Sequence, residues 1–260
     1  MKIKETARII SQECLCGGIF SMWIKTKAAK YAEAGQFISV YPKSAARLLP
    51  RPISICEIKA PDELRIVYRV AGKGTEEFSH YRAGDEIEIL GPNGNGFFAA
   101  AGEETEKNKK ALLFGGGIGI PPMLELAKQL ECEVSIIAGY RSAEDTFLME
   151  ELEEAGKLYV ATDDGSLGVH GTVIDAAREY GIGADIVFAC GPLPMLRAVK
   201  VYSEERNIPA YVSMEERMAC GVGACLGCVC TSVHKDDHSK VNNKRICADG
   251  PVFPASEVEL

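Results

Sequence analysis

Residues 111–122 read Ala111-Leu112-Leu113-Phe114-Gly115-Gly116-Gly117-Ile118-Gly119-Ile120-Pro121-Pro122. The first four residues form a short apolar run, which is typical of a buried strand. Glycine permits the sharp turn that follows, and proline is tolerated in the first turn of a helix. The stretch therefore predicts a strand, a glycine turn and then a helix over residues 123–130, which is the repeating unit of an α/β fold.

Further apolar runs follow this unit at residues 134–138, 158–161 and 186–189, and they alternate with helical segments. This alternation predicts a doubly wound parallel sheet, in which ligands bind at the carboxyl ends of the strands. Two turns lie at such ends, the glycine turn at 115–119 and Cys190-Gly191-Pro192. The first lacks the third glycine of the usual dinucleotide fingerprint. The alternative is that both are merely tight turns, with Cys190 a buried thiol.

The residues before this unit have a different pattern. Short β-rich runs at 36–41, 64–70 and 86–90 are bounded by Gly, Pro and Asp, and they predict a small antiparallel barrel. A polar stretch at 102–110 is interpreted as a linker or loose loop. We therefore predict three domains, a barrel over 1–101, an α/β domain over 102–211 and a small cysteine-rich domain over 212–260.

The bulk composition is that of a globular protein. The 260 residues are 47% hydrophobic and carry a net charge of −8, which disfavours binding to nucleic acid. The N-terminus has no apolar segment typical of a signal peptide, and no uncharged apolar run reaches the roughly 18 residues that cross a bilayer. We therefore expect a cytoplasmic protein that binds neither nucleic acid nor membrane.

Half of the ten cysteines lie after residue 219. In a reducing compartment such a cluster indicates metal binding more than disulfides. Cys220, Cys225 and Cys228 have the spacing C-x4-C-x2-C of plant-type [2Fe–2S] sites, and Cys247 is a distant fourth thiol. Structural zinc, which favours paired C-x2-C motifs, and disulfides or free thiols remain alternatives. Cys230 is interpreted as a buried neighbour of the site.

Two segments of the predicted barrel could contact a flavin. Arg51-Pro52-Ile53-Ser54 begins an apolar run, and the planar fork of Arg51 can bond two oxygens of a diphosphate. Gly72 and Gly74 would let backbone N–H groups approach phosphate, and Thr75 can cap the following helix. An ordinary strand start and an ordinary strand-to-helix turn are the alternatives.

The order of these motifs along the chain resembles the ferredoxin–NADP reductase superfamily with a C-terminal [2Fe–2S] extension. Within it, the residues around Cys220–Cys230 and the closing stretch Ile246–Phe253 closely resemble the electron-transfer subunits of dihydroorotate dehydrogenase B. The resemblance covers essentially the whole chain. Ile53 departs from the wider superfamily, in which many members carry an aromatic residue.

The resemblance implies three sets of binding residues. FAD is expected in the barrel, at Arg51, Pro52, Ile53, Ser54, Val67, Tyr68, Arg69, Gly74 and Thr75. NAD, a diffusible co-substrate, is expected at Gly115, Gly116, Gly117, Gly119, Cys190, Gly191 and Pro192. The [2Fe–2S] cluster is expected on Cys220, Cys225, Cys228 and Cys247. Asp163-Asp164-Gly165-Ser166 resembles a superfamily loop on the nucleotide side, and a plain polar turn is its alternative.

The resemblance also implies a function in pyrimidine biosynthesis. Electrons would pass from an FMN-containing dihydroorotate dehydrogenase catalytic subunit through the [2Fe–2S] cluster and FAD to NAD+. The partner subunit would perform the dehydrogenation, since this chain shows no convincing general base, and the complex would hold two copies of each subunit. The alternatives are a reductase subunit that serves ferredoxin or a hydrogenase, and a zinc-stabilised nucleotide-binding module without turnover.

Overall fold

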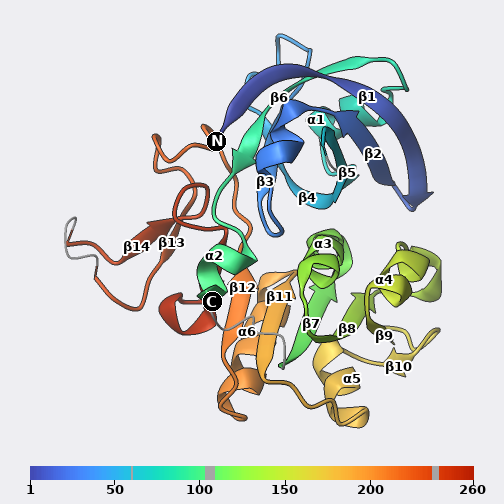
Figure 1. Ribbon diagram of the computed structural model, residues 1–260, viewed down its shortest axis with the longest axis vertical. Helices are drawn as coiled ribbons and strands as arrows, with labels where there is room; N and C mark the ends of the chain where they lie inside the picture. The colour runs from blue at the N-terminus through green and yellow to red at the C-terminus, as the bar shows by residue number, and fades with distance from the viewer. Residues whose placement is uncertain (60, 103–108, 236–239) are drawn as a thin grey trace.

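The computed structural model describes residues 1–59, 61–102, 109–235 and 240–260. The linker predicted at 102–110 therefore lies largely outside the described residues. Two compact bodies are visible in Figure 1, a barrel and an α/β sheet, with the C-terminal tail beside both. Among the described residues, no helix is long and apolar enough to cross a membrane.

The N-terminal body is a closed antiparallel barrel with strand order β1-β2-β5-β4-β3-β6, as the sequence predicts. Alternate residues of each strand point inward and form an apolar core that includes Ile24, Ile55 and Ile66. Its strands are β1 (Ile3–Cys16), β2 (Ile19–Lys25), β3 (Phe37–Tyr41), β4 (Arg51–Lys59), β5 (Glu63–Arg69) and β6 (Glu86–Asn93). The helices α1 (Lys73–Ser79) and α2 (Phe97–Ala101) and the 3-10 turn η1 (Lys27–Tyr31) complete this part.

The second body is a seven-stranded sheet of order β10-β9-β8-β7-β11-β12-β15, and its first six strands are parallel. The predicted doubly wound sheet is therefore confirmed. Its strands are β7 (Lys110–Gly116), β8 (Glu133–Tyr140), β9 (Lys157–Thr162), β10 (Val169–His170), β11 (Ile186–Cys190), β12 (Ala210–Ser213) and β15 (Val252–Pro254). β7 runs two residues beyond Phe114, because Gly115 and Gly116 still pair with β8.

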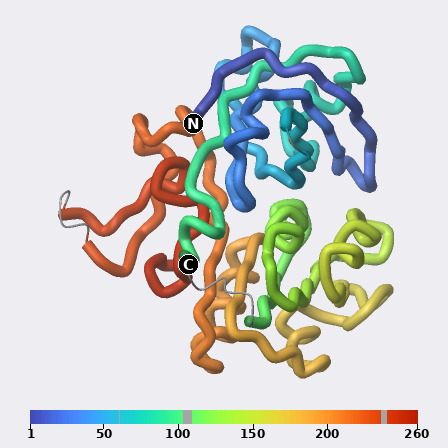
Figure 2. Tube along the Cα trace, in the orientation of Figure 1, coloured from blue at the N-terminus to red at the C-terminus, as the bar shows by residue number. Residues whose placement is uncertain are grey.

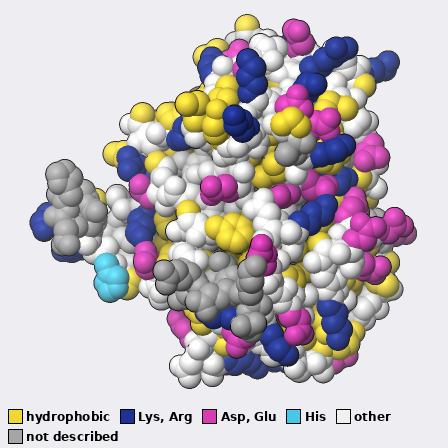
Figure 3. Space-filling view, viewed as in Figure 1, with side chains coloured by type: hydrophobic (Ala, Val, Ile, Leu, Met, Phe, Trp, Pro, Cys, Tyr) yellow, Lys and Arg dark blue, Asp and Glu magenta, His cyan; other side chains and the backbone are white. Residues whose placement is uncertain are grey.

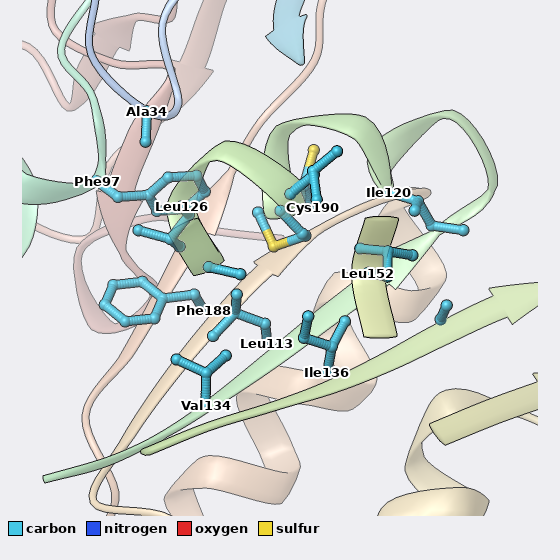
Figure 4. Packing of buried hydrophobic residues seen from close by; sticks show 14 of the residues in the cluster. Ala34, Phe97, Leu113, Ile120, Leu126, Val134, Ile136, Leu152, Phe188 and Cys190 are labelled. Carbon is cyan, nitrogen blue, oxygen red and sulfur yellow. The ribbon is translucent and has the colours of Figure 1, made fainter. Parts of the chain in front are cut away.

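Helices cover both faces of this sheet. α3 (Pro121–Gln129) and α4 (Met149–Ala155) pack on one face, and α5 (Val173–Glu179) and α6 (Leu193–Glu204) pack on the other. Figure 4 shows the first of these cores, where Phe97 of α2 meets Phe188 of β11 edge to face at 5.5 Å between ring centroids. The segment that leaves the barrel is thus buried against the sheet.

The tail contains the two-stranded ribbon of β13 (Val229–Thr231) and β14 (Asn243–Arg245), then β15 and the 3-10 turn η5 (Ala255–Glu257). β15 pairs antiparallel with β12, so the tail supplies the edge strand of the sheet. Figure 2 shows the tail, in red, beside the green segment that leaves the barrel. β12 continues across the domain boundary predicted after residue 211. The three predicted domain limits stay predictions.

Candidate functional site

Arg51 and Gly74, from the two predicted flavin motifs, lie against each other. A Cβ atom at Gly74 would lie 2.5 Å from Nε and 2.7 Å from Nη2 of Arg51, so only glycine leaves room for the guanidinium there. The Arg51 guanidinium also donates to the Leu49 carbonyl at 2.5 Å. The barrel therefore brings together β4 and the first turn of α1, which are 23 residues apart in sequence.

A cavity of about 800 Å³ opens beside this arginine. It is lined by Ala46, Arg47, Leu48, Leu49, Pro50, Arg51, Pro52, Glu215, Glu216, Arg217 and Met218. Ile53, Val67 and Tyr68 are buried in the hydrophobic cores, and Ser54 is half-buried outside the lining. Among the predicted flavin residues, Arg51 and Pro52 thus contact the cavity directly, and the contacts of the others with FAD stay predictions.

Thr75 has a different local role from the one that its sequence position indicates. The helix α1 begins at Lys73, so Thr75 lies within its first turn and Gly72 is the N-cap residue. The Thr75 hydroxyl accepts the backbone N–H groups of Ala71 at 2.9 Å and Gly72 at 3.2 Å. It therefore fixes the turn before the helix, which in turn sets the position of Gly74.

The predicted glycine turn packs directly on the Cys190 turn. β7 and β11 are parallel neighbours, with Gly115 opposite Cys190. A Cβ at Gly119 would lie 2.2 Å from the Cys190 carbonyl oxygen and 2.6 Å from the Gly191 nitrogen. Gly119 is therefore required by close backbone approach, and the two predicted nucleotide motifs form one wall.

A second cavity, of about 560 Å³, lies between this wall and the barrel. Arg69 reaches it from β5, and a Cβ at Gly117 would lie 3.3 Å from its Nη2 atom. Of the predicted residues, it is lined by Arg69, Gly116, Gly117, Gly191 and Pro192, and Asp163 of the predicted polar loop also contacts it. Motifs from both bodies therefore meet in one cleft, which has the position expected for a nicotinamide nucleotide.

Ile118 of the predicted glycine turn lines the cavity too, and the other lining residues were not found from the sequence: Gly17, Ile19, Gly139, Tyr140, Arg141, Asp145, Phe147, Gly171, Thr172, Val173, Met195 and Glu215. Gly139, Tyr140 and Arg141 lie at the carboxyl end of β8, so the rule that ligands bind at strand ends could have found them. Gly171 and Glu215 also follow strands, β10 and β12, but neither strand was predicted from the sequence. The remaining residues carry no comparable signal, because they come from segments far apart in the chain.

Glu215 lines both cavities. It follows β12 and is exposed to solvent at the mouths of the two cavities. Desolvation by the surrounding protein raises the pKa of Glu215, and the nearby positive charge of Arg69 acts in the opposite direction. Glu215 is therefore a protonatable group at the junction of the two candidate ligand sites.

The three clustered cysteines lie on one tight loop. Positive φ angles occur at Gly221 (68°), Gly223 (85°) and Leu226 (56°), which lets the chain wrap around a small volume. Backbone N–H groups point at the thiols: Gly223 donates to Cys247 Sγ at 3.1 Å and Val222 to Cys220 Sγ at 3.5 Å. Cys228 and Cys247 are buried, and Cys225 is exposed.

The four thiols influence one another: Cys220 interacts with Cys225, and Cys247 interacts with Cys228 and also with Cys220. Burial acts to raise the pKa of Cys220, but N–H groups of the loop and the Cys225 thiol outweigh it and lower the pKa to about 6. Burial and Cys228 raise the pKa of Cys247 to about 12. No set of three His, Cys, Asp or Glu side chains in the described part of the chain converges on a single-ion position. Four cysteines, three on one loop and Cys247 on a neighbouring turn, match the number of ligands of a two-iron cluster.

The tail and the whole chain match known proteins. Residues 215–259 match the family model described as the iron–sulfur cluster binding domain of dihydroorotate dehydrogenase B. The chain is 40% identical over 257 residues to the Listeria monocytogenes dihydroorotate dehydrogenase B (NAD(+)), electron transfer subunit, covering 97% of this chain and 98% of the relative. It is also 40% identical to the Streptococcus mutans subunit of that name over 264 residues, covering 100% of both chains.

Solved structures also resemble this chain over most of its length. A structure titled as an NADH-dependent reduced ferredoxin–NADP oxidoreductase has a TM-score of 0.84 and 28% identity, covering 97% of this chain and 89% of that one. A Neisseria gonorrhoeae ferredoxin NADP+ reductase with bound FAD and NADP has a TM-score of 0.66 at 16% identity, covering 82% and 94%, and supports the fold alone. Given its full-length identity to the curated relatives, this chain belongs to the family of dihydroorotate dehydrogenase B electron transfer subunits.

Proposed function

We propose that this chain is the electron-transfer subunit of an NAD-dependent dihydroorotate dehydrogenase and exchanges electrons between a catalytic partner subunit and NAD+. One observation carries the proposal: the segment 215–218 connects all three candidate sites. Glu215 lines both cavities, Glu216 to Met218 line the larger one, and Cys220 follows two residues later. Nucleotide cleft, flavin cavity and cysteine loop are thus contiguous.

The residues of each site have a distinct task. Arg51 would hold the FAD diphosphate, because its fork can bond two oxygens and Gly74 leaves it room. The glycine turn at 116–119 and the turn at 190–192 would let the nucleotide approach the backbone closely. FAD, when bound, exchanges hydride with NAD and single electrons with a cluster, which links two-electron to one-electron chemistry. Glu215 can hold or release a proton where these sites meet.

The catalytic partner is proposed to contain FMN and to dock on the tail. Near the exposed Cys225 in sequence, three apolar residues are exposed: Val222 is 40%, Leu226 62% and Val229 38% accessible. Apolar side chains exposed beside a cluster suit a protein contact, and docking there would bring the cluster close to the partner's flavin. A complex with two copies of each subunit is proposed on the resemblance, and multi-angle light scattering of the co-purified proteins tests it.

The cytoplasm is the proposed location. All ten cysteines are unpaired, which fits a compartment that keeps thiols reduced. Acidic and basic side chains are interspersed on the face shown in Figure 3. Cell fractionation with a periplasmic or secreted control protein tests this location, and recovery outside the cytoplasmic fraction would contradict it.

The decisive experiment records absorption spectra of the anaerobically purified complex. We expect flavin and iron–sulfur bands that bleach with NADH and recover with orotate when the partner is present. Cys225→Ser should remove the iron–sulfur bands and the recovery with orotate, whereas flavin bleaching by NADH should persist. Cys230→Ser is the matched control and should retain all three. A colourless zinc protein, produced with ample iron and flavin, would refute the proposal.

A second candidate is electron exchange with a ferredoxin-type carrier. It is favoured by the structural neighbour titled as a reduced ferredoxin–NADP oxidoreductase, which aligns over 97% of this chain. The two functions differ in their acceptor. Reoxidation by ferredoxin without a catalytic partner, and not by orotate with one, would support this second candidate.

A further inference from the structure

Arg245 connects the loop of the first three cysteines to the turn that carries the fourth. Its Nε and Nη2 atoms donate hydrogen bonds to the two carboxylate oxygens of Asp249, at 3.0 and 2.8 Å, and form a bidentate ion pair. Its Nη1 atom donates to the Gly223 carbonyl at 3.2 Å. The Arg245 backbone N–H donates to Asp249 as well, at 2.8 Å. One side chain thus bridges two segments that are 22 residues apart in sequence.

This bridge lies against the thiols. Gly223, whose carbonyl Arg245 binds, donates its own N–H to Cys247 Sγ at 3.1 Å. The Arg245 guanidinium is therefore linked to the Cys247 thiol through a single residue, Gly223. The Asp249 carboxylate binds the Nε and Nη2 atoms of the same guanidinium.

We propose that the Arg245–Asp249 pair sets the reduction potential of the cluster held by Cys220, Cys225, Cys228 and Cys247. The inference rests on the proposed function, since it requires that cluster. One electron enters on reduction and no bond breaks, so the site gains one negative charge. The positive charge of Arg245 favours the reduced cluster, and the negative charge of Asp249 reduces this effect. The hydrogen bond to Gly223 holds the Arg245 guanidinium in position.

The neighbouring Lys244 provides a matched control. Adjacent residues of a strand point to opposite faces, and Lys244 forms an ion pair with Glu257 and lies 5.5 Å from the centroid of the Phe253 ring. Lys244→Gln therefore removes the same charge one residue away but leaves the Gly223 contact intact.

The experiment is a dithionite titration of the full holoprotein with redox mediators, followed by the electron paramagnetic resonance signal of the reduced cluster. Arg245→Gln should make reduction about tenfold less favourable, a shift of about −59 mV for a one-electron couple. Asp249→Asn should shift the potential by about the same amount in the positive direction. Lys244→Gln should change it by less than half as much. Iron and sulfide per chain are measured for every variant.

Opposite signs for the two variants support the proposal, because a purely structural role would lower cluster content in both without moving the potential of what remains. Shifts of equal sign, or none, overturn it. If Arg245→Gln assembles no cluster, two other variants test the proposal. Arg245→Lys retains the charge and should leave the potential close to that of wild type, whereas Asp249→Asn should raise it. Loss of the cluster in all three variants would also overturn the proposal. A wild-type protein without a [2Fe–2S] signal would instead refute the proposed function.

Discussion

Glu77 holds the loop that forms one wall of the larger cavity. Its carboxylate accepts the Lys43 backbone N–H at 2.6 Å, Arg47 Nη1 at 2.7 Å and the Tyr81 hydroxyl at 2.7 Å. Lys43 and Arg47 belong to the loop before β4, and residues 46–52 line the cavity. One carboxylate on α1 therefore fixes the segment that leads to Arg51.

Replacing this carboxylate with an amide, Glu77→Gln, should weaken FAD binding. Bonds to charged groups contribute about 1.5–3 kcal/mol, but this ion pair is partly exposed, with 29% of the Arg47 side chain and 16% of the Glu77 side chain accessible. Discounted for solvent, the loss is about 1–2 kcal/mol. If loop order limits binding, this corresponds to a dissociation constant roughly 5–30 times higher.

The same contact has a defined pH dependence. Burial acts to raise the pKa of Glu77, but the bonds from Tyr81, Lys43 and Arg47 outweigh it and lower the pKa. A carboxyl group whose pKa is lowered on folding stabilises the folded state above its unfolded pKa of about 4.3, and this contribution is lost as the pH falls through the lower folded value. The Glu77 carboxylate is therefore ionised at neutral pH, where its contribution to stability is fully present.

The assay is a fluorescence titration of apoprotein with FAD at pH 7.5. Glu76→Gln is the matched control on the same helix, because Glu76 pairs only with the exposed Lys73 among the ion pairs of the described residues. Its effect should stay within about twofold, as for surface substitutions generally. Equal dissociation constants for Glu77→Gln and wild type would show that the loop does not limit flavin binding.

Three further substitutions test other contacts. Gly119→Ala places a Cβ 2.2 Å from the Cys190 carbonyl oxygen, so overpacking should cost about 1–3 kcal/mol in thermal unfolding and slow flavin reduction by NADH. Burial raises the pKa of Glu125, so wild-type stability should fall as the pH rises from about 4.3 through the raised value. Glu125→Gln removes this cost, and urea unfolding at pH 4 and pH 8 should show its advantage only at pH 8. Arg65→Met removes the partner that bonds Glu57 at 2.6 Å, but Lys128 still bonds the same carboxylate. The substitution should therefore cost about 1–3 kcal/mol in urea unfolding, and a loss below about 0.5 kcal/mol would contradict a buried role for this pair.

Local patterns were sufficient to predict the architecture. The turn at 115–119 and the apolar runs after it indicate a parallel sheet because each strand, turn and helix is continuous in sequence. The cysteine spacing likewise lies within nine residues, from Cys220 to Cys228, and Gly221 and Gly223 have the positive φ angles that a wrapping loop needs. These features depend on chain geometry over short distances, which sequence records directly.

Features formed by distant segments could not be predicted in this way. Glu215 gains its position only because β12 ends where the two cavities meet. The edge strand β15 looks like part of an irregular tail, since its pairing with β12 bridges about 40 residues of intervening chain. Thr75 could be placed near the helix start, but its partners depend on where the strand before it ends.

The tail is bonded to both earlier parts of the chain, and this has a consequence for electron transfer. Asn95, which follows the barrel, donates its backbone N–H to the Gly250 carbonyl at 2.6 Å, and β15 pairs with β12 of the sheet. At the cysteine loop, Gly221 approaches the barrel so closely that a Cβ would lie 2.7 Å from Ser39 Oγ. Because electron transfer requires short distances, these contacts hold the cysteine loop at a fixed separation from the larger cavity. A substitution that loosened the tail would therefore uncouple the two sites even while each kept its own ligands.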